Sequence, residues 1–272
     1  MNVETTAQPL LDRLIAAIDA HGPLAVAVSG GVDSMTLAHV AWRFARERPV
    51  MMHAVGPAVP ASARQRLDEH AQREGWPLQL LDAGEQGDPR YRANPIDRCY
   101  YCKNNLYARM RAASTRTIAS GTNLDDLADF RPGLRAAGEH AVVHPFVEAG
   151  LDKAAVYAIA AGLGLADLER LPPQPCLASR VETGIPIDAG DLAFIDRVEA
   201  MLTALRGTSA VHRCRVTSRG IVVELGEVAG AAGPAEVAEA LARAACADDG
   251  RAFAGVRGYV RGSAFVQPVA DG

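Results

Sequence analysis

The sequence predicts an α/β fold with a mostly parallel sheet, followed by a smaller α+β domain. Strand and helix signals alternate over the first two thirds of the chain, as they do in βαβ units. The apolar run 24–28 leads directly into a glycine pair and then into a helical pattern. Near Pro186 the alternation gives way to a long helix and a hairpin. We therefore expect a first domain over residues 1–183 and a second over 184–272.

Each expected element follows from local periodicity and from its flanking residues. Apolar segments predict strands of the parallel sheet at 24–28, 51–55, 78–81, 117–120 and 141–143. Amphipathic patterns predict helices at 35–46, 61–74, 98–113 and 152–162, the last with Asp152 as N-cap. In the second domain we expect a helix over 188–205, hairpin strands 211–217 and 221–225, a helix over 234–245 and a strand over 256–261.

Bulk composition is that of a water-soluble enzyme. The 272 residues are 49% hydrophobic and 22% charged, and the formal net charge is −4. An acidic balance argues against a nucleic-acid partner, which favours a basic domain. No apolar run is long enough to span a bilayer, and Met1–Asp12 lacks the apolar core of a signal peptide. We therefore expect a cytoplasmic enzyme with no membrane partner.

The hexapeptide Ser29-Gly-Gly-Val-Asp-Ser34 is the strongest candidate for a binding site. Gly30 and Gly31 let backbone N–H groups turn inward to cradle a phosphate where a helix begins. The hydroxyls of Ser29 and Ser34 can donate to phosphate, whereas Asp33 is suited to hold Mg²⁺. The Gly121-Thr-Asn123 turn also follows a strand, so both turns should face one crevice. A Walker A loop is excluded because the turn has no lysine.

Three cysteines form the second candidate site. Cys99 and Cys102 lie three residues apart at the start of a helical pattern, with Asp97 as N-cap, so both thiols share one face. Cys176 lies far along the chain, four residues before Arg180. Three interpretations remain open: a [4Fe–4S] cluster on all three cysteines, a redox dithiol, or a zinc site completed by a residue such as His144. Cys214 and Cys246 are expected in the core.

Taken together, the motifs resemble the LarE family of ATP-dependent sulfur transferases, within the ATP-pyrophosphatase (PP-loop) superfamily. The segments that carry the resemblance are Ser29–Ser34, Asp97–Lys103, Gly121–Asp126, 130–136 and Pro175–Gly184. It implies a Rossmann-like sheet of the adenine nucleotide alpha hydrolase type.

The resemblance also implies a reaction. ATP would adenylate a carboxylate of pyridinium-3,5-biscarboxylate mononucleotide, releasing pyrophosphate, and sulfur would then give a thiocarboxylate on the way to the nickel-pincer nucleotide cofactor of lactate racemase. Members with the cysteine pair bind a [4Fe–4S] cluster through residues that match Cys99, Cys102 and Cys176. Other members sacrifice the cysteine that matches Cys176. The expected cofactors are ATP, Mg²⁺ and the cluster. A homo-oligomer is implied, and a separate sulfide donor protein remains open.

Further residues match the family's pattern. The match assigns Asp125 and Asp126 to ATP or Mg²⁺, with a capped helix start as the alternative. It assigns Ser179 and Arg180 to phosphate contact. Lys153 resembles the superfamily's lysine near the triphosphate. Glu199 and Glu224 match acids linked to metal or oligomer contacts, with a solvated helix face and a strand edge as alternatives. The usual arginine before Glu224 is missing, which weakens a metal role there.

Three other functions remain open. A tRNA thiolation enzyme of the same superfamily would use the same activation chemistry, but the acidic composition argues against it. An ammonia-dependent amidotransferase or synthetase would need no thiolates. A nucleotide-binding regulator would bind ATP without releasing pyrophosphate.

Overall fold

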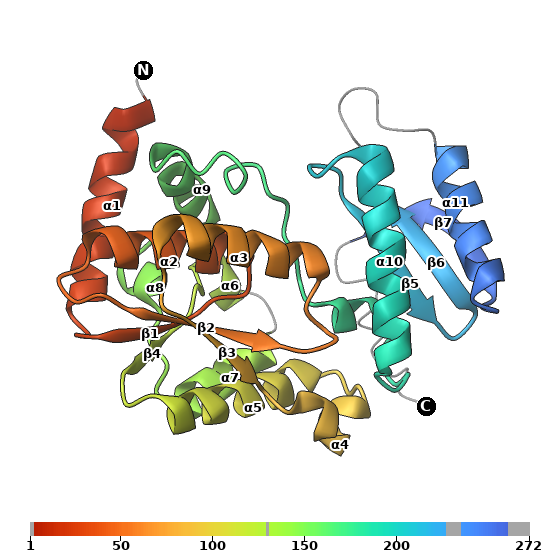
Figure 1. The fold of residues 1–272 in the computed structure, drawn as a ribbon, viewed down its shortest axis with the longest axis horizontal. Coiled ribbons are helices and arrows are strands. Elements are labelled where there is room, and N and C mark those ends of the chain that lie inside the picture. The colour runs from red at the N-terminus through yellow and green to blue at the C-terminus, as the bar shows by residue number, and fades with distance from the viewer. Residues whose placement is uncertain (1–2, 129–130, 227–234, 261–272) are drawn as a thin grey trace. The chain divides into compact units, whose positions relative to one another are not determined.

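A computed structural model describes residues 3–128, 131–226 and 235–260, which form two compact units (Figure 1). The first unit runs to Asp88 and continues over Asp97–Pro173; the second comprises Pro89–Ile96 and the chain from Gln174 onward. A four-stranded parallel sheet lies in the first unit and a three-stranded mixed sheet in the second. The α/β class with a smaller α+β region is thereby confirmed. The functional boundary after residue 183 stays a prediction.

In the first unit, helices cover both faces of the sheet. Its strands lie in the order β3-β2-β1-β4, with β1 Leu24–Ala27, β2 Val50–Val55, β3 Leu78–Asp82 and β4 Thr117–Ala119. Leu24 and Val26 pack into one apolar cluster and Ala25 into another, because successive side chains of a strand point to opposite faces. One face carries α1 Val3–Asp19, α2 Val32–Phe44, α3 Ala61–Glu74 and α9 Lys153–Gly162; the other carries α5 Arg98–Ala113 and α7 Pro132–Glu139 (Figure 1).

Most predicted elements of this unit are confirmed, and the differences have local causes. Helix α2 begins at Val32 rather than Met35, so Asp33 and Ser34 belong to its first turn. The predicted strand 141–143 is wrong: Ala141 has a φ of 48°, which interrupts an extended run, and Val143 alone bridges to Ala119. Helix α1 was not predicted. Short helices complete the unit at η1 Glu85–Gly87, α6 Asp125–Ala128 and α8 Pro145–Glu148.

The second unit packs two helices against its mixed sheet. Strand β5 His212–Thr217 forms a hairpin with β6 Gly220–Leu225, and β7 Phe253–Gly258 pairs with β6 in parallel. Helices α10 Ala189–Arg206 and α11 Ala235–Asp248 pack on it, and α4 Pro89–Arg92 and η2 Leu177–Arg180 also belong to this unit. The hairpin requires glycine at 220, because φ is +116° and a Cβ would lie 2.5 Å from the carbonyl oxygen of Ala252.

Predictions for the second unit are largely confirmed. Asp188 caps α10 by accepting hydrogen bonds from the N–H groups of Gly190 and Asp191. Cys214 and Cys246 are buried, as expected of core residues. The last strand begins at Phe253, three residues before the predicted start at Val256. Pro234 and Arg261, at the ends of two predicted elements, lie outside the described residues.

Two buried histidines join the helices that flank the Ser29–Ser34 loop. His39 on α2 and His70 on α3 meet at 2.7 Å between Nε2 and Nδ1, and Nε2 of His70 lies 2.8 Å from Oδ2 of Asp167. The Trp76 ring packs edge-on against His39. Burial, reinforced by the positive charge of His70 and Arg43, lowers the pKa of His39 from 6.5 to about 3. His39 therefore stays neutral in the folded protein.

This cluster predicts acid sensitivity of the first unit. The folded-state pKa of His39 lies below the unfolded one, so its contribution to stability is complete above pH 6.5 and is lost as pH falls toward 3. The free energy of unfolding should drop by about 1.4 kcal/mol per pH unit in this window because of His39 alone. Urea titrations followed by tryptophan fluorescence can measure this, since Trp42 and Trp76 both lie in the first unit. His39→Gln should flatten the slope; an unchanged slope would contradict the assignment.

Candidate functional site

The Ser29–Ser34 loop joins β1 to α2 and is closed by its own hydroxyl groups. Oγ of Ser34 accepts a hydrogen bond from the N–H of Ser29 at 3.0 Å and donates to the carbonyl of Gly31 at 3.2 Å. The two serine hydroxyls lie 3.1 Å apart. This network fixes the turn at the N-terminus of α2, where backbone N–H groups favour an anion.

Helix α3 holds the loop from the side. Gly30 has a φ of +79°, and a Cβ there would lie 2.4 Å from the carbonyl oxygen of Ala63, so only glycine fits. Nη1 of Arg66 donates to the carbonyl of Gly30 at 2.8 Å. Burial lowers the pKa of Arg66. Sequence reasoning missed Arg66, because no motif separates it from the other arginines of the helix.

Asp33 is the charged centre of this site. Nζ of Lys153, in the first turn of α9, donates to Oδ1 and Oδ2 of Asp33 at 2.7 and 2.5 Å. Nδ2 of Asn123 donates to Oδ1 at 3.0 Å. The Asp33 and Lys153 side chains are 28% and 24% exposed, so both can meet a ligand. A partly exposed carboxylate is a hard oxygen donor of the kind that Mg²⁺ prefers, but Lys153 and Asn123 engage both oxygens here, so the ion would have to displace Lys153 to bind. A role of Asp33 in binding Mg²⁺ stays a prediction.

The Gly121–Asn123 turn lies against the loop, as predicted. A Cβ on Gly121 would lie 2.7 Å from the backbone nitrogen of Ser34, so the two turns approach to backbone contact. The contact follows from the topology, because β1 and β4 are neighbouring parallel strands and both turns leave their carboxyl ends. Asn123 is buried beside Asp33. The structure thus brings together Asp33, Lys153 and Asn123 from three separate segments.

Asp125 and Asp126 contact local backbone and side-chain groups. Oδ2 of Asp126 accepts from the N–H of Asn123 at 3.1 Å, and Arg131 pairs with Oδ1 of Asp126 at 2.6 Å. Oδ2 of Asp125 accepts from the N–H of Lys153 at 3.3 Å. These contacts support the capped-helix alternative, and they also hold Lys153 at the site. A role of either carboxylate in binding ATP or Mg²⁺ stays a prediction.

The Cys99–Cys102 pair lies in the first turn of α5, and both side chains are half-buried. Asp97 occupies the N-cap position, but its side chain makes no capping hydrogen bond. Tyr100 fastens this turn to α7, since the Arg135 guanidinium stacks 3.7 Å from its ring centre and its hydroxyl donates to Glu139 at 2.8 Å. The pair therefore lies on a helix start that Tyr100 holds against α7.

The structure tests the alternatives for the cysteines only in part. None of the five cysteines is in a disulfide. His144, the fourth ligand of the zinc interpretation, contacts Oγ of Ser120 through Nδ1 at 2.9 Å. Within residues 3–128, 131–226 and 235–260, no three His, Cys, Asp or Glu side chains are grouped as a metal site. Cys176 belongs to the second unit, and the cluster stays a prediction.

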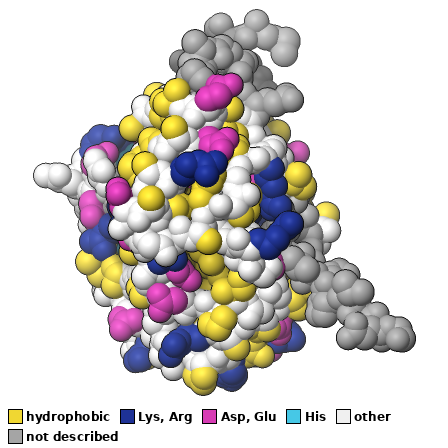
Figure 2. Space-filling model, turned by 90° about the vertical axis from the view of Figure 1, so that its right-hand side faces the viewer, with side chains coloured by type: hydrophobic (Ala, Val, Ile, Leu, Met, Phe, Trp, Pro, Cys, Tyr) yellow, Lys and Arg dark blue, Asp and Glu magenta, His cyan; other side chains and the backbone are white. Residues whose placement is uncertain are grey.

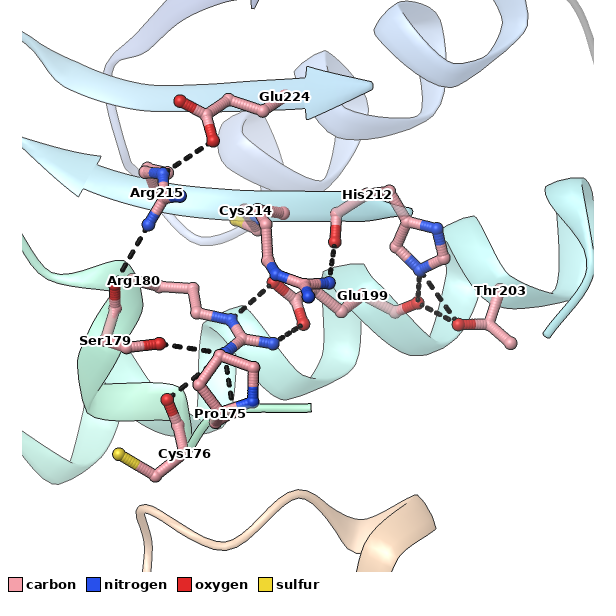
Figure 3. Close-up of polar contacts among 11 residues, drawn as sticks. Pro175, Cys176, Ser179, Arg180, Glu199, Thr203, His212, Cys214, Arg215 and Glu224 are labelled. Atoms are coloured by element: carbon pink, nitrogen blue, oxygen red, sulfur yellow. Dashed lines mark hydrogen bonds and ion pairs between the residues drawn. The ribbon is translucent and has the colours of Figure 1, made fainter. Parts of the chain in front are cut away.

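Arg180 organises the segment that carries Cys176 (Figure 3). Its Nη1 donates to the carbonyl oxygens of Pro175 and Cys176 at 2.6 and 3.1 Å and to Oγ of Ser179 at 2.9 Å. Nε and Nη2 donate to the two carboxylate oxygens of Glu199 at 3.0 and 2.8 Å. The family resemblance assigns Ser179 and Arg180 to phosphate contact, which stays a prediction. In the structure, Nε, Nη1 and Nη2 of Arg180 all donate to protein groups.

Glu199 and Glu224 are buried and form ion pairs. The two alternatives, a solvated helix face for Glu199 and a strand edge for Glu224, are therefore wrong. The Glu199 side chain is 12% exposed rather than solvated. Burial alone would raise its pKa, but the charges of Arg180 and Arg213 outweigh burial and lower it. Glu224 is fully buried on β6, the central strand rather than an edge, and pairs with Arg215 and Arg257. The cross-strand register explains the Arg257 contact, which no motif indicated.

The surface shows mixed charge where it is drawn. On the face in Figure 2, Lys and Arg side chains stand singly or in small groups with Asp and Glu among them. Across the described helices, none has both the length and the apolarity that crossing a membrane requires.

Comparison with known proteins gives three relatives, and no protein-family model matches. An uncharacterized protein of Synechocystis is 35% identical over 184 residues, which is 66% of this chain and 68% of the relative. An uncharacterized protein of Methanocaldococcus jannaschii is 32% identical over 114 residues, covering 40% of this chain and 44% of that protein.

The third relative has a named activity. The pyridinium-3,5-bisthiocarboxylic acid mononucleotide synthase of Lactiplantibacillus plantarum is 28% identical over 203 residues, which is 71% of each chain. This similarity supports the resemblance to LarE proteins that the motifs indicated. The coverage and identity of the Synechocystis match show that the chain belongs to the same protein family as that cyanobacterial protein.

Proposed function

We propose that this protein is an ATP-dependent sulfurtransferase that converts a carboxylate of pyridinium-3,5-biscarboxylate mononucleotide to a thiocarboxylate, in the biosynthesis of the nickel-pincer nucleotide. The observation that carries the proposal is the meeting of the Ser29–Ser34 loop with Asp33, Lys153 and Asn123 at the carboxyl ends of β1 and β4. The relative named as a pyridinium-3,5-bisthiocarboxylic acid mononucleotide synthase supports the choice of substrate.

The first unit supplies the activation step. A carboxylate is a poor electrophile, and its charge repels a sulfur nucleophile. Transfer of AMP breaks the bond between the α and β phosphates, joins the carboxylate oxygen to the α phosphate and releases pyrophosphate. Backbone N–H groups of the loop and the Lys153 ammonium stabilise the charge that develops on the leaving group. Asp33 is the residue that would hold Mg²⁺, which when bound supplies further positive charge there.

The three cysteines serve the second step, in which a carbon–sulfur bond forms as AMP leaves. Cys99 and Cys102 are positioned together on the braced start of α5, and Cys176 is presented by the segment that Arg180 holds. In this proposal the three cysteines would hold a [4Fe–4S] cluster, which when bound would provide the transferred sulfur. The half-buried state of all three thiols supports access for a ligand.

The activation step can be tested at Asp33. Asp33→Asn is nearly isosteric but removes the charge that holds Lys153 and would bind Mg²⁺. We expect pyrophosphate release from ATP, in the presence of the mononucleotide, to fall about 100-fold or more. Asp68→Asn is a matched control, because Asp68 pairs with Arg64 on the exposed side of α3. Equal rates for Asp33→Asn and the control would contradict the role of Asp33.

A second test uses the contact between the two turns. Gly121→Ala would push a methyl group to 2.7 Å from the Ser34 nitrogen, so the loop must shift. We expect weaker ATP binding by calorimetry and a loss of stability of about 1–3 kcal/mol. Gly138→Ala on α7 meets no atom within 4 Å and should leave both properties intact. If Gly121→Ala binds ATP as the wild type does, the turn does not shape the nucleotide site.

The sulfur source is tested by iron content and by the fate of Cys176. Anaerobically reconstituted protein should contain about four irons and four acid-labile sulfides per chain. Cys99→Ser or Cys102→Ser should lose them, whereas Cys246→Ser, in the core of the second unit, should not. Absence of iron in the wild type would exclude the cluster. Loss of H₂S from the Cys176 peptide after turnover, detected by mass spectrometry, would instead show that this cysteine is consumed.

A further inference from the structure

One guanidinium holds the backbone around Cys176. The carbonyl oxygens of both Pro175 and Cys176 accept hydrogen bonds from Nη1 of Arg180. Figure 3 shows the Cys176 carbonyl directed toward Arg180 and the sulfur directed away from it. These hydrogen bonds restrict rotation of the main chain at Cys176, and they fix the position of the Cβ atom from which the thiol projects.

Glu199 in turn fixes that guanidinium. Its carboxylate pairs with Nε and Nη2 of Arg180 in the two-point geometry that defines the plane and the rotation of an arginine. The backbone N–H of Cys214 donates to Oε1 of Glu199 at 2.9 Å, which ties the carboxylate to strand β5. Side chains are only 3% exposed at Arg180 and 12% at Glu199, so water offers little replacement for this support.

Nearby charges make Glu199 hard to replace. Arg213 also acts on this carboxylate, and its own pKa is lowered by burial and by the charge of Arg180. Glu199 is therefore the counter-charge in a group of buried guanidinium groups. Loss of its charge would leave Arg180 buried without its carboxylate, and the arginine would then be expected to turn away from the carbonyl of Cys176.

We propose that Glu199 is a positioning residue that acts through Arg180 to fix the backbone of Cys176 and thereby the direction of its thiol. This inference rests on the proposed function, in which Cys176 takes part in sulfur transfer. It differs from the metal or oligomer role that the family resemblance implied, because both oxygens of Glu199 are engaged by protein donors.

The experiment compares Glu199→Gln, Glu199→Asp and the double variant Arg180→Met/Glu199→Gln with the wild type. Asp249→Asn is the control, since Asp249 forms a more exposed ion pair with Arg197 in the same unit. Three quantities are measured on each protein: pyrophosphate release, thiocarboxylate formation, and the rate at which iodoacetamide alkylates Cys176 before cluster reconstitution. Peptide mass spectrometry reports Cys99 and Cys102 in the same sample as internal references.

If Glu199 positions Cys176, its replacement should affect thiocarboxylate formation and pyrophosphate release differently. Glu199→Gln should lower kcat for thiocarboxylate formation by about a hundredfold, the cost of misplacing a reacting group by an ångström. Pyrophosphate release should fall far less than thiocarboxylate formation, and Cys176 should be alkylated several-fold faster while the reference cysteines are not. Glu199→Asp, which keeps the charge, should recover part of the loss. Wild-type kcat and wild-type alkylation in Glu199→Gln would overturn the proposal.

The double variant separates positioning from stability. Replacing Arg180 as well removes the buried guanidinium that would have lost its carboxylate, so the unit should unfold at a higher temperature than in Glu199→Gln. Positioning predicts that thiocarboxylate formation stays impaired despite this recovery, whereas full recovery would show that Glu199 matters only for stability. If the wild type releases no pyrophosphate with the mononucleotide, the proposed function fails. The alkylation rates would then still decide whether Glu199 positions Cys176.

Discussion

The ion pair between Asp33 and Lys153 is the interaction on which the candidate site depends. Asp33 lies in the first turn of α2, where an acidic side chain interacts favourably with the helix dipole but would repel the phosphates that the loop is shaped to hold. Lys153 cancels this charge from another segment, so the pair carries no net charge before any ligand arrives. Because both side chains are partly exposed, the pair itself stabilises the fold little, by about 0–1 kcal/mol. The pair matters mainly for the electrostatics of the crevice. The packing of α2 and α9 brings Asp33 and Lys153 together.

For the Arg180–Glu199 pair, the cost of removing the charges from water is much larger than for Asp33 and Lys153. This pair is almost completely buried, so its desolvation cost is high and is offset only when every donor finds an acceptor. The carbonyl oxygens of Pro175 and Cys176 and the hydroxyl of Ser179 complete that set. A charged pair is a costly way to hold a loop that apolar packing could also hold. The pair adds orientation, because a planar guanidinium fixes how each of its hydrogen-bond acceptors is oriented. That is what a reactive cysteine in this segment would require.

Local sequence patterns predicted the features that depend on residues close together in the chain, such as the bounds of helices. Helices 61–74 and 98–113 agree with their predicted bounds because their amphipathic patterns are uninterrupted and their ends carry turn residues. The meeting of the two turns also followed from the rule that parallel strands end at one edge. Other features depend on contacts between segments far apart in the sequence, which local patterns do not reveal. These are the contact of Arg66 with Gly30, the Arg180–Glu199 pair, and the place of Pro89–Ile96 in the second unit. Ala141 shows that a local pattern can also mislead. The run 141–143 has the composition of a strand, but the positive φ of Ala141 prevents an extended conformation there.

Glu224 is held by arginines on both neighbouring strands. The LarE family, which this chain resembles, has an arginine before this glutamate, and residues 220–223 contain none. Arg257 on β7 lies opposite Glu224 in the parallel register and donates twice to Oε1. Arg215 on β5 takes Oε2 at 2.7 Å. Both oxygens are thus engaged by guanidinium groups on either side of the central strand, and a cation would have to displace them to bind. The geometry therefore favours a structural role for Glu224, which links β5, β6 and β7. Through Arg215, which also donates to the carbonyl of Ser179, that link extends to the segment carrying Cys176.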